Sequence, residues 1–275
     1  MSALVQLAFS FGRDRDLIHH FQDELPEDVH LHDLRSDLDA NRTWMSLSGE
    51  FEPVAAFVMR ACELAFARIN LQKHAGEHPR IGALDRCDWI GISSEQLRSF
   101  SETLAKSFSL PVFDKESNLR DLGFGGLLER LLNPPFGPSH CHETLGVTTV
   151  TLREFYVTIA ATFEEEFPHF AQSRHRDIEN RRGEYEPMFL GVKSLAYMMP
   201  SFEQSRLMIE FAEPDTAPPD PVLEWLDRRA KGAGVVLKGF EVVGALRQQD
   251  LLETRNVPIR PEQVFDELSL EGLSL

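Results

Sequence analysis

Short strand-like runs of apolar residues alternate along this chain with longer amphipathic runs, and this alternation restricts the fold more than any other feature. Strands are predicted over 3–9, 29–34, 41–49, 89–92, 110–114, 146–152, 191–199, 205–211 and 235–246. Helices are predicted over 14–25, 53–71, 94–109 and 221–231, whereas the charged segment 170–187 interrupts the alternation. Because the connections are short, the pattern favours helices packed on sheets, in two layered units with a boundary near residue 155.

Composition narrows the class of protein. The chain has 275 residues, enough for one large domain or two smaller ones, and its formal net charge of −16 disfavours nucleic acids and anionic membranes as partners. No apolar run approaches the roughly 20 residues of a membrane helix, and the first residues carry no signal-peptide pattern. The 3 cysteines are widely spaced, which argues against a disulfide framework. We therefore expect a cytoplasmic protein.

The segment 73–87, KHAGEHPRIGALDRC, combines titratable side chains with residues that shape the backbone. Proline restricts φ and lacks an N–H, while glycine tolerates positive φ, so Gly76, Pro79 and Gly82 predict a shaped loop. Loops held between regular elements often carry catalytic groups. A solvated polar connection is the alternative interpretation.

Two sequence patterns resemble metal sites. His74, Glu77 and His78 match the H-x-x-E-H zinc pattern, but Gly76 and Pro79 oppose the helix that this pattern needs. The run 140–142, His-Cys-His, cannot direct three consecutive side chains at one ion, so a polar loop is favoured there. We expect no metal.

Acid–base chemistry at His78 is the remaining hypothesis from the residues themselves. The ordinary pKa of histidine, about 6.5, allows the ring to accept and donate a proton near neutral pH. Glu77, Arg80 and Asp85 lie close enough in sequence to orient this histidine or a substrate.

These segments together resemble the formiminotransferase family, whose members move a formimino group between glutamate and N5 of tetrahydrofolate. The specific part is NRT (41–43) followed by KHAGEHPRIGALDRC. FSFGRDRD (9–16) and FGPSHCHETLG (136–146) resemble further family segments, and the likeness covers roughly residues 1–253 in the family order.

The resemblance implies an α+β fold of two ferredoxin-like α/β sandwich subdomains packed around a substrate cleft or tunnel. Their expected bounds are 1–155 and 156–253, followed by an acidic C-terminal tail, 254–275. It also implies a homodimer with tetrahydrofolate as co-substrate, glutamate-like small molecules as partners and no metal. We expect no cyclodeaminase domain, so that step would need a separate protein.

The resemblance also implies roles for individual residues. His78 would be the general acid/base. Substrate contacts would come from Arg42, Glu77, Arg80, Asp85 and Arg153, with the arginines pairing with carboxylates. Folate contacts would come from the 136–146 segment, at Gly137, Pro138, Ser139, His140 and Gly146.

Several positions depart from the family pattern. Phe11 replaces a glutamate, Arg35 replaces the second aspartate of Asp-x-Asp, and Asp88 replaces a proline. The polar strand of the second subdomain reads SRLMIE at 205–210. Two alternatives therefore stay open beside formimino transfer: a non-catalytic relative that binds a folate-like ligand or a partner, and a formyl rather than formimino transferase. A zinc hydrolase is a third interpretation.

Overall fold

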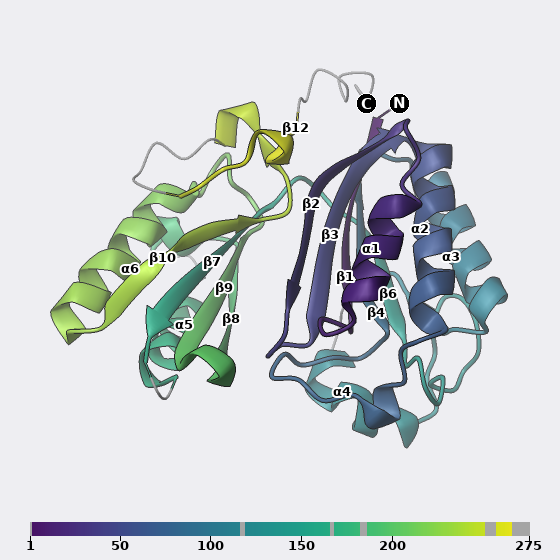
Figure 1. Cartoon of the computed structure of the whole chain (residues 1–275), viewed down its shortest axis with the longest axis horizontal. Helices are drawn as coiled ribbons and strands as arrows, with labels where there is room; N and C mark the ends of the chain where they lie inside the picture. The colour runs from purple at the N-terminus through teal and green to yellow at the C-terminus, as the bar shows by residue number, and fades with distance from the viewer. Residues whose placement is uncertain (1, 116–118, 166–167, 182–185, 251–256, 266–275) are drawn as a thin grey trace. The chain divides into compact units, whose positions relative to one another are not determined.

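The computed structural model describes residues 2–115, 119–165, 168–181, 186–250 and 257–265 (Figure 1). The chain divides into two compact units, Met1–Arg153 and Glu154–Glu267. Helices and strands are mixed in both, so the predicted α+β class is confirmed. No helix of the described ranges is long and apolar enough to cross a membrane.

The first unit is built on a 6-stranded sheet with the order β2-β3-β1-β4-β6-β5. Its strands are β1 (Ser2–Phe9), β2 (Val29–Asp37), β3 (Arg42–Glu50), β4 (Leu84–Ile90), β5 (Val112–Phe113) and β6 (Thr148–Leu152). Its helices are α1 (Arg15–Asp23), α2 (Phe51–Phe66), α3 (Ser94–Phe108) and α4 (Leu119–Leu128). β1 pairs antiparallel with β3 and β4, while β6 runs parallel to β4 and β5.

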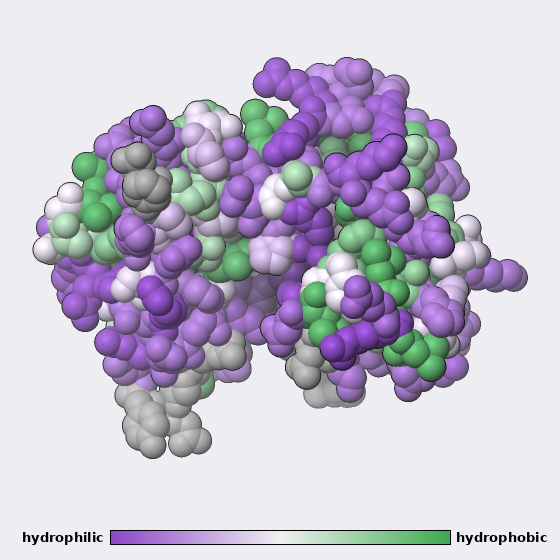
Figure 2. Space-filling view, turned by 90° about the horizontal axis from the view of Figure 1, so that it is seen from below, coloured by the Kyte–Doolittle hydropathy of each residue, from purple (hydrophilic) through white to green (hydrophobic). Residues whose placement is uncertain are grey.

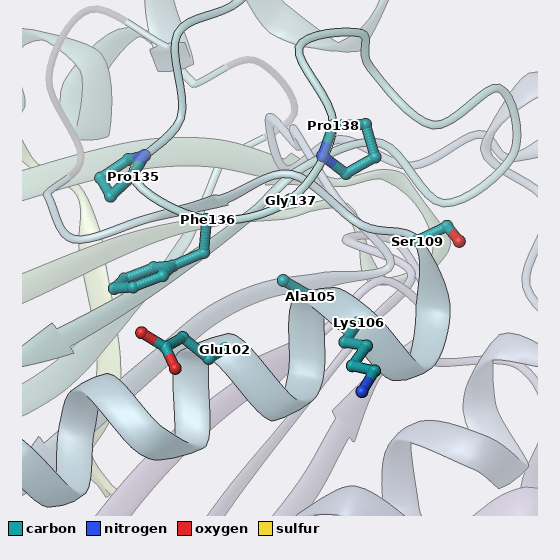
Figure 3. A pocket seen from close by; sticks show the side chains of 8 residues that line it. All are labelled: Glu102, Ala105, Lys106, Ser109, Pro135, Phe136, Gly137 and Pro138. Carbon is teal, nitrogen blue, oxygen red and sulfur yellow. The ribbon is translucent and has the colours of Figure 1, made fainter.

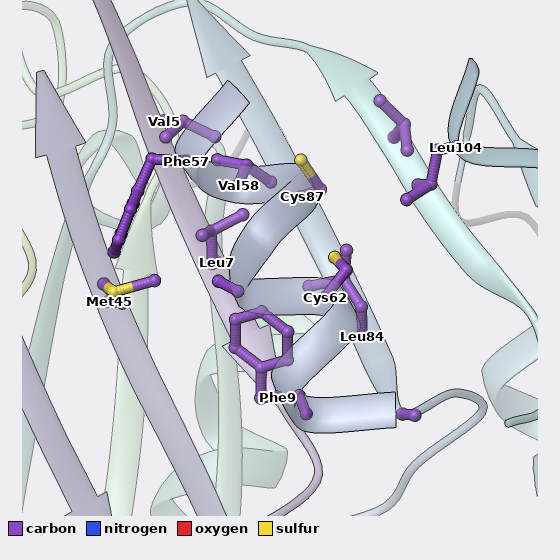
Figure 4. Packing of buried hydrophobic residues seen from close by; sticks show 14 of the residues in the cluster. Val5, Leu7, Phe9, Met45, Phe57, Val58, Cys62, Leu84, Cys87 and Leu104 are labelled. Atoms are coloured by element: carbon purple, nitrogen blue, oxygen red, sulfur yellow. The ribbon is translucent and has the colours of Figure 1, made fainter. Parts of the chain in front are cut away.

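The core of this unit lies between the sheet and its helices. Strand residues two apart point to the same face, so Val5, Leu7 and Phe9 of β1 all pack toward α2 (Figure 4). Cys62 of α2 and Cys87 of β4 lie in the same core as fully buried free thiols. Burial raises the pKa of both thiols, so they behave as small apolar side chains.

Two predicted boundaries in this region were wrong. The helix expected over 53–71 is α2, which ends at Phe66, and Leu71–Lys73 form a separate 3-10 turn. The loop expected to reach residue 87 ends earlier, because β4 begins at Leu84 and pairs with β1. Asp85 therefore lies on a strand.

The second unit repeats the order strand, helix, two strands, helix, strand. Its elements are β7 (Val157–Glu164), α5 (His169–Arg181), β8 (Val192–Met199), β9 (Gln204–Phe211), α6 (Pro219–Ala233) and β10 (Val236–Val243). The 4-stranded sheet has the order β10-β7-β9-β8, with antiparallel pairs throughout. A short parallel pair, β11 (Leu246–Arg247) with β12 (Val264–Phe265), completes the described part.

The charged segment 170–187 does not interrupt the pattern, because most of it is α5. Glu165 stabilises the start of this helix by accepting the backbone N–H groups of Phe170 and Ala171. Of the predicted acidic tail, 254–275, residues 254–256 and 266–275 lie outside the described residues.

A small second core fixes α4 beside the sheet of the first unit. Its buried members are Ile81, Leu119, Leu127, Leu132, Cys141 and Val147. Beyond this core the surface is partly apolar: hydrophobic residues gather on the face of the first unit seen from below (Figure 2), and the Leu131 side chain is 76% exposed. Leu119 packs in this core, and the neighbouring Arg120 reaches Asp85 near the start of β4.

Gly82 joins this small core to the sheet through a close backbone contact. It forms a β-bridge with Gly146, and Val147 N–H donates to the Ile81 carbonyl at 2.9 Å. A Cβ atom added at Gly82 would lie 1.8 Å from the Val147 carbonyl oxygen. Only glycine fits here without movement of the backbone.

We expect Gly82→Ala to lower the free energy of unfolding by about 3 kcal/mol, the upper part of the range for overpacking. Gly125→Ala is the matched control, because an added Cβ there meets no atom within 4 Å and alanine favours the helix. Urea denaturation of both variants measures the difference. Equal stability of the two variants would contradict the close contact.

Candidate active site

Three loops of the first unit are tied together at one end of its sheet by Asn41. The Asn41 side-chain oxygen accepts the Gly12 N–H at 2.8 Å, and its amide donates to the Ala75 carbonyl at 2.9 Å. Asn41 has a φ of 48°, a left-handed conformation that asparagine tolerates better than most residues. One residue of the turn between β2 and β3 thus holds both the segment after β1 and the 74–83 loop.

The same loops approach so closely that glycine is needed at the contacts. A Cβ added to Gly12 would lie 2.2 Å from the Asp37 carbonyl oxygen, and one added to Gly76 would lie 2.3 Å from the Ala40 carbonyl oxygen. Two glycines of the predicted motifs therefore serve loop packing. This packing gives the 74–83 loop a defined shape without a helix.

His78 lies half-buried in this loop, with its ring edge-on to Trp44 at a centroid distance of 6.1 Å. Its Nδ1 donates to the Pro79 carbonyl at 2.7 Å. Burial lowers the pKa of His78 well below its usual value, and the charge of Arg42 lowers it further. At neutral pH the ring is therefore uncharged, with the proton on Nδ1 and the basic lone pair on Nε2.

Asp85 is the buried anion beside this histidine. One carboxylate oxygen accepts the backbone N–H groups of Ile81 at 2.6 Å and Gly82 at 3.2 Å. The other oxygen is bound by Arg42 and, at 3.0 Å, by Arg120 of α4. Burial alone would raise the pKa of Asp85, but the two guanidinium groups outweigh it and hold the pKa well below its usual range.

The predicted carboxylate-binding arginines Arg42 and Arg80 are both engaged with their own chain. Arg42 is 2% exposed and binds Asp85 and the Pro79 carbonyl. Arg80 donates to the carbonyls of Gly76 and His78 and to Nδ1 of His74. Burial and the charge of Arg80 lower the pKa of His74 to about 4. These groups shape the loop, and their predicted substrate contacts stay predictions.

Glu77 and Arg153 make other contacts. The Glu77 side chain is exposed, and its backbone N–H donates to the Asp39 carbonyl at 2.9 Å. Arg153 pairs with the buried Asp88 at 3.6 Å, and Asp88 also binds Arg86 and the Thr151 hydroxyl. Asp88 is one of the positions that depart from the family pattern, so this departure creates an ion-pair cluster around Arg153.

The predicted folate-contacting residues are divided between two places. Gly146 lies against Gly82, next to the loop that carries His78. Gly137 and Pro138 instead line a cavity of about 510 Å³ at the last turn of α3, opposite Glu102 and Lys106 (Figure 3). Ser139 and His140 lie between them, where the Ser139 carbonyl accepts the Leu132 N–H at 2.7 Å and His140 bridges to Leu131.

The H-x-x-E-H pattern lies on a loop, not on the helix that a zinc site of this pattern needs. Residues 74–80 have no helical turn, and Nδ1 of His74 accepts a hydrogen bond from Arg80. Within the described ranges, no group of three or more His, Cys, Asp and Glu side chains is placed to hold a metal ion.

Arg120, Asn41 and Trp44 belong to the site, but the sequence interpretation gave them no role. Arg120 reaches Asp85 from a helix 35 residues further along the chain. The sequence signals were weak: Asn41 is the first residue of the NRT motif, Trp44 directly follows it, and Arg120 lies outside every predicted helix and quoted motif.

The comparisons with known proteins decide the family. The model of the formiminotransferase domain, N-terminal subdomain, matches residues 3–153, which is more than half of the chain. The chain belongs to the formiminotransferase family. The resemblance first seen in the 73–87 segment is therefore confirmed.

Similar proteins agree with this family. The chain is 24% identical to the formimidoyltransferase-cyclodeaminase of Dictyostelium discoideum, over 96% of this chain and 54% of that protein. It is also 24% identical to the glutamate formimidoyltransferase of Streptococcus pyogenes serotype M1, over 86% of this chain and 85% of that protein. The chain therefore spans about half the length of the two-activity relative and most of the single-activity one.

The lowered pKa of His74 predicts a loss of stability in acid. The unfolded chain binds a proton near pH 6.5 and the folded chain only near pH 4, so stability falls as the pH drops through this interval. The slope contributed by this residue is at most about 1.4 kcal/mol per pH unit.

We expect His74→Gln to reduce the loss of unfolding free energy between pH 7 and pH 4.5, because glutamine cannot take up the proton. Its side-chain oxygen can still accept from Arg80. His19→Gln is the control, since His19 is exposed on α1. Urea denaturation at several pH values measures the slopes. An unchanged slope in His74→Gln would contradict the prediction.

Proposed function

We propose that this protein transfers a formimino group between glutamate and N5 of tetrahydrofolate, with His78 as the general acid/base. One observation carries the role of His78: its ring is held through Nδ1, so its basic nitrogen is Nε2. The lowered pKa of His78 leaves the ring uncharged at neutral pH, and this is the form that can take a proton from the attacking nitrogen. The reaction itself comes from the family and from the names of the single-activity relatives.

The chemistry requires one proton to move between two nitrogens. N5 of tetrahydrofolate forms a bond to the formimino carbon while the C=N π pair moves onto the imino nitrogen, giving a tetrahedral centre that also carries the glutamate nitrogen. His78 Nε2 takes the proton from N5 and delivers it to the glutamate nitrogen as the old carbon–nitrogen bond breaks and the C=N bond re-forms. Holding the two amines together would supply a further part of the rate, because it replaces an encounter between free reactants.

Arg120 is the best placed arginine for recognition of a substrate carboxylate at His78. Its side chain is 28% exposed, whereas Arg42 beside it is almost fully buried. Its guanidinium is also close enough to influence the pKa of His78. We assign Arg42, Arg80 and Asp85 to shaping the site, and Arg153 with Glu77 remain candidates for contacts further from His78.

The fold supports the same family assignment. Both units contain the strand–helix–strand–strand–helix–strand order, with β4-β1-β3-β2 neighbours in the first and β10-β7-β9-β8 in the second. We infer that both are ferredoxin-like subdomains, with β5 and β6 added to the edge of the first. Among the predicted folate-contacting residues, Gly146 forms a bridge with Gly82 of the loop that carries His78, which supports its proposed role.

The test is formimino transfer by the purified protein supplied with formiminoglutamate and tetrahydrofolate. We expect His78→Gln to lower kcat by about 10²–10⁴-fold, the usual share of a general acid/base, with little change in the KM for tetrahydrofolate. The exposed His19→Gln should keep wild-type turnover. A decrease in kcat of less than severalfold in His78→Gln would contradict the role of His78 as general acid/base.

The wild-type protein alone separates the main alternatives. Saturable tetrahydrofolate binding without turnover would favour the non-catalytic relative. Turnover with a formyl donor in place of formiminoglutamate would favour the formyl transferase.

A further inference from the structure

The Pro79 carbonyl oxygen is the meeting point of two side chains. It accepts Nδ1–H of His78 at 2.7 Å and a guanidinium N–H of Arg42 at 3.3 Å. A carbonyl oxygen has two lone pairs, so it can accept both bonds at once. The orientation of the His78 ring therefore depends on where this one carbonyl points.

Asp85 is linked to the Pro79 carbonyl by two sets of hydrogen bonds. Through one oxygen it accepts the backbone N–H groups of Ile81 and Gly82, the two residues that follow Arg80. Through the other oxygen it binds Arg42, the side chain that donates to Pro79. The Asp85 carboxylate thus holds both the backbone that follows Pro79 and the Arg42 guanidinium that donates to the Pro79 carbonyl.

From this geometry we infer that Asp85 and Arg42 are positioning residues that act on His78 through the Pro79 carbonyl and hold the ring in the Nδ1–H form. This inference rests on the proposed function for its catalytic consequence, and on the hydrogen bonds alone for its structural part. It offers an alternative to the prediction that Asp85 and Arg42 contact substrate. Both side chains are too deeply buried for that role, with exposures of 0% and 2%.

The burial of Arg42 agrees with a fixed structural role. Its Nε has no hydrogen-bond partner among the described residues, although its two terminal nitrogens are both engaged. Moving the Arg42 guanidinium away from Asp85 would leave buried charges without compensation, which costs free energy. The orientation of the group is therefore determined by Asp85 and Pro79 together.

Two variants break the series of contacts from Asp85 through Arg42 and Pro79 to His78 at different points. In Asp85→Asn, the amide oxygen can still accept from Ile81 and Gly82, but its NH₂ group opposes Arg42 and Arg120. In Arg42→Lys, the single ammonium cannot reach both Asp85 and the Pro79 carbonyl. Asp88→Asn is the matched control, because Asp88 is also a buried aspartate of β4 that pairs with arginines, here Arg86 and Arg153.

The first measurement is ¹⁵N–¹H correlation NMR of the folded protein labelled with ¹⁵N-histidine, which distinguishes protonation at Nδ1 from protonation at Nε2. We expect wild-type His78 and the Asp88→Asn control to carry the proton on Nδ1. Asp85→Asn and Arg42→Lys should shift the population toward Nε2–H. A wild-type ring protonated on Nε2 would overturn the inference, as would wild-type His78 signals in whichever of the two variants folds.

The second measurement is steady-state kinetics with formiminoglutamate and tetrahydrofolate. A misdirected ring should lower kcat by about 10²-fold, with the KM for tetrahydrofolate nearly unchanged. A wild-type protein without turnover would contradict the proposed function. The NMR result would still test whether Asp85 and Arg42 position the His78 ring. Normal kcat in a variant with a shifted proton would overturn the catalytic part of the inference.

Discussion

The buried carboxylate of Asp85 is the interaction on which the geometry of the candidate site depends. From β4, it gathers two backbone N–H groups of the preceding loop and the guanidinium groups of Arg42 on β3 and Arg120 on α4. Removing one partner of a buried ion pair leaves a charge without compensation, which usually costs several kcal/mol. The loop that carries His78 therefore cannot change shape without breaking this cluster.

The cluster also explains why a site with so many charges keeps a neutral histidine. Burial of the ring is the largest cause of the lowered pKa of His78. Arg42 and Arg120 lower this pKa further, while Asp85 opposes them in part. A base that is uncharged and oriented at neutral pH is what proton transfer between two amines requires.

Two departures from the family pattern form ion pairs with neighbours on their own strands. Arg35 forms an ion pair with Asp33 at 2.7 Å, and Asp88 binds both Arg86 and Arg153. Register pairing places Asp33, Ser46, Gln6 and Asp88 in one row across the sheet, whereas Arg35 lies opposite Trp44, in the row that includes Arg86. Each changed charge therefore has an ion-pair partner, while the His78 loop keeps its signature.

The sequence by itself determined the family, the α+β class and the candidate base, because these depend on local periodicity and on one continuous signature around His78. It did not reveal that Asp85 belongs to a strand, since Leu84 and Asp85 show their role only when β4 pairs with β1. Only the tertiary structure decided that Arg42 meets a carboxylate 43 residues away and that Arg120 joins them from α4. Such contacts depend on how separate elements pack, and the spacing of residues along the sequence does not predict which of them meet.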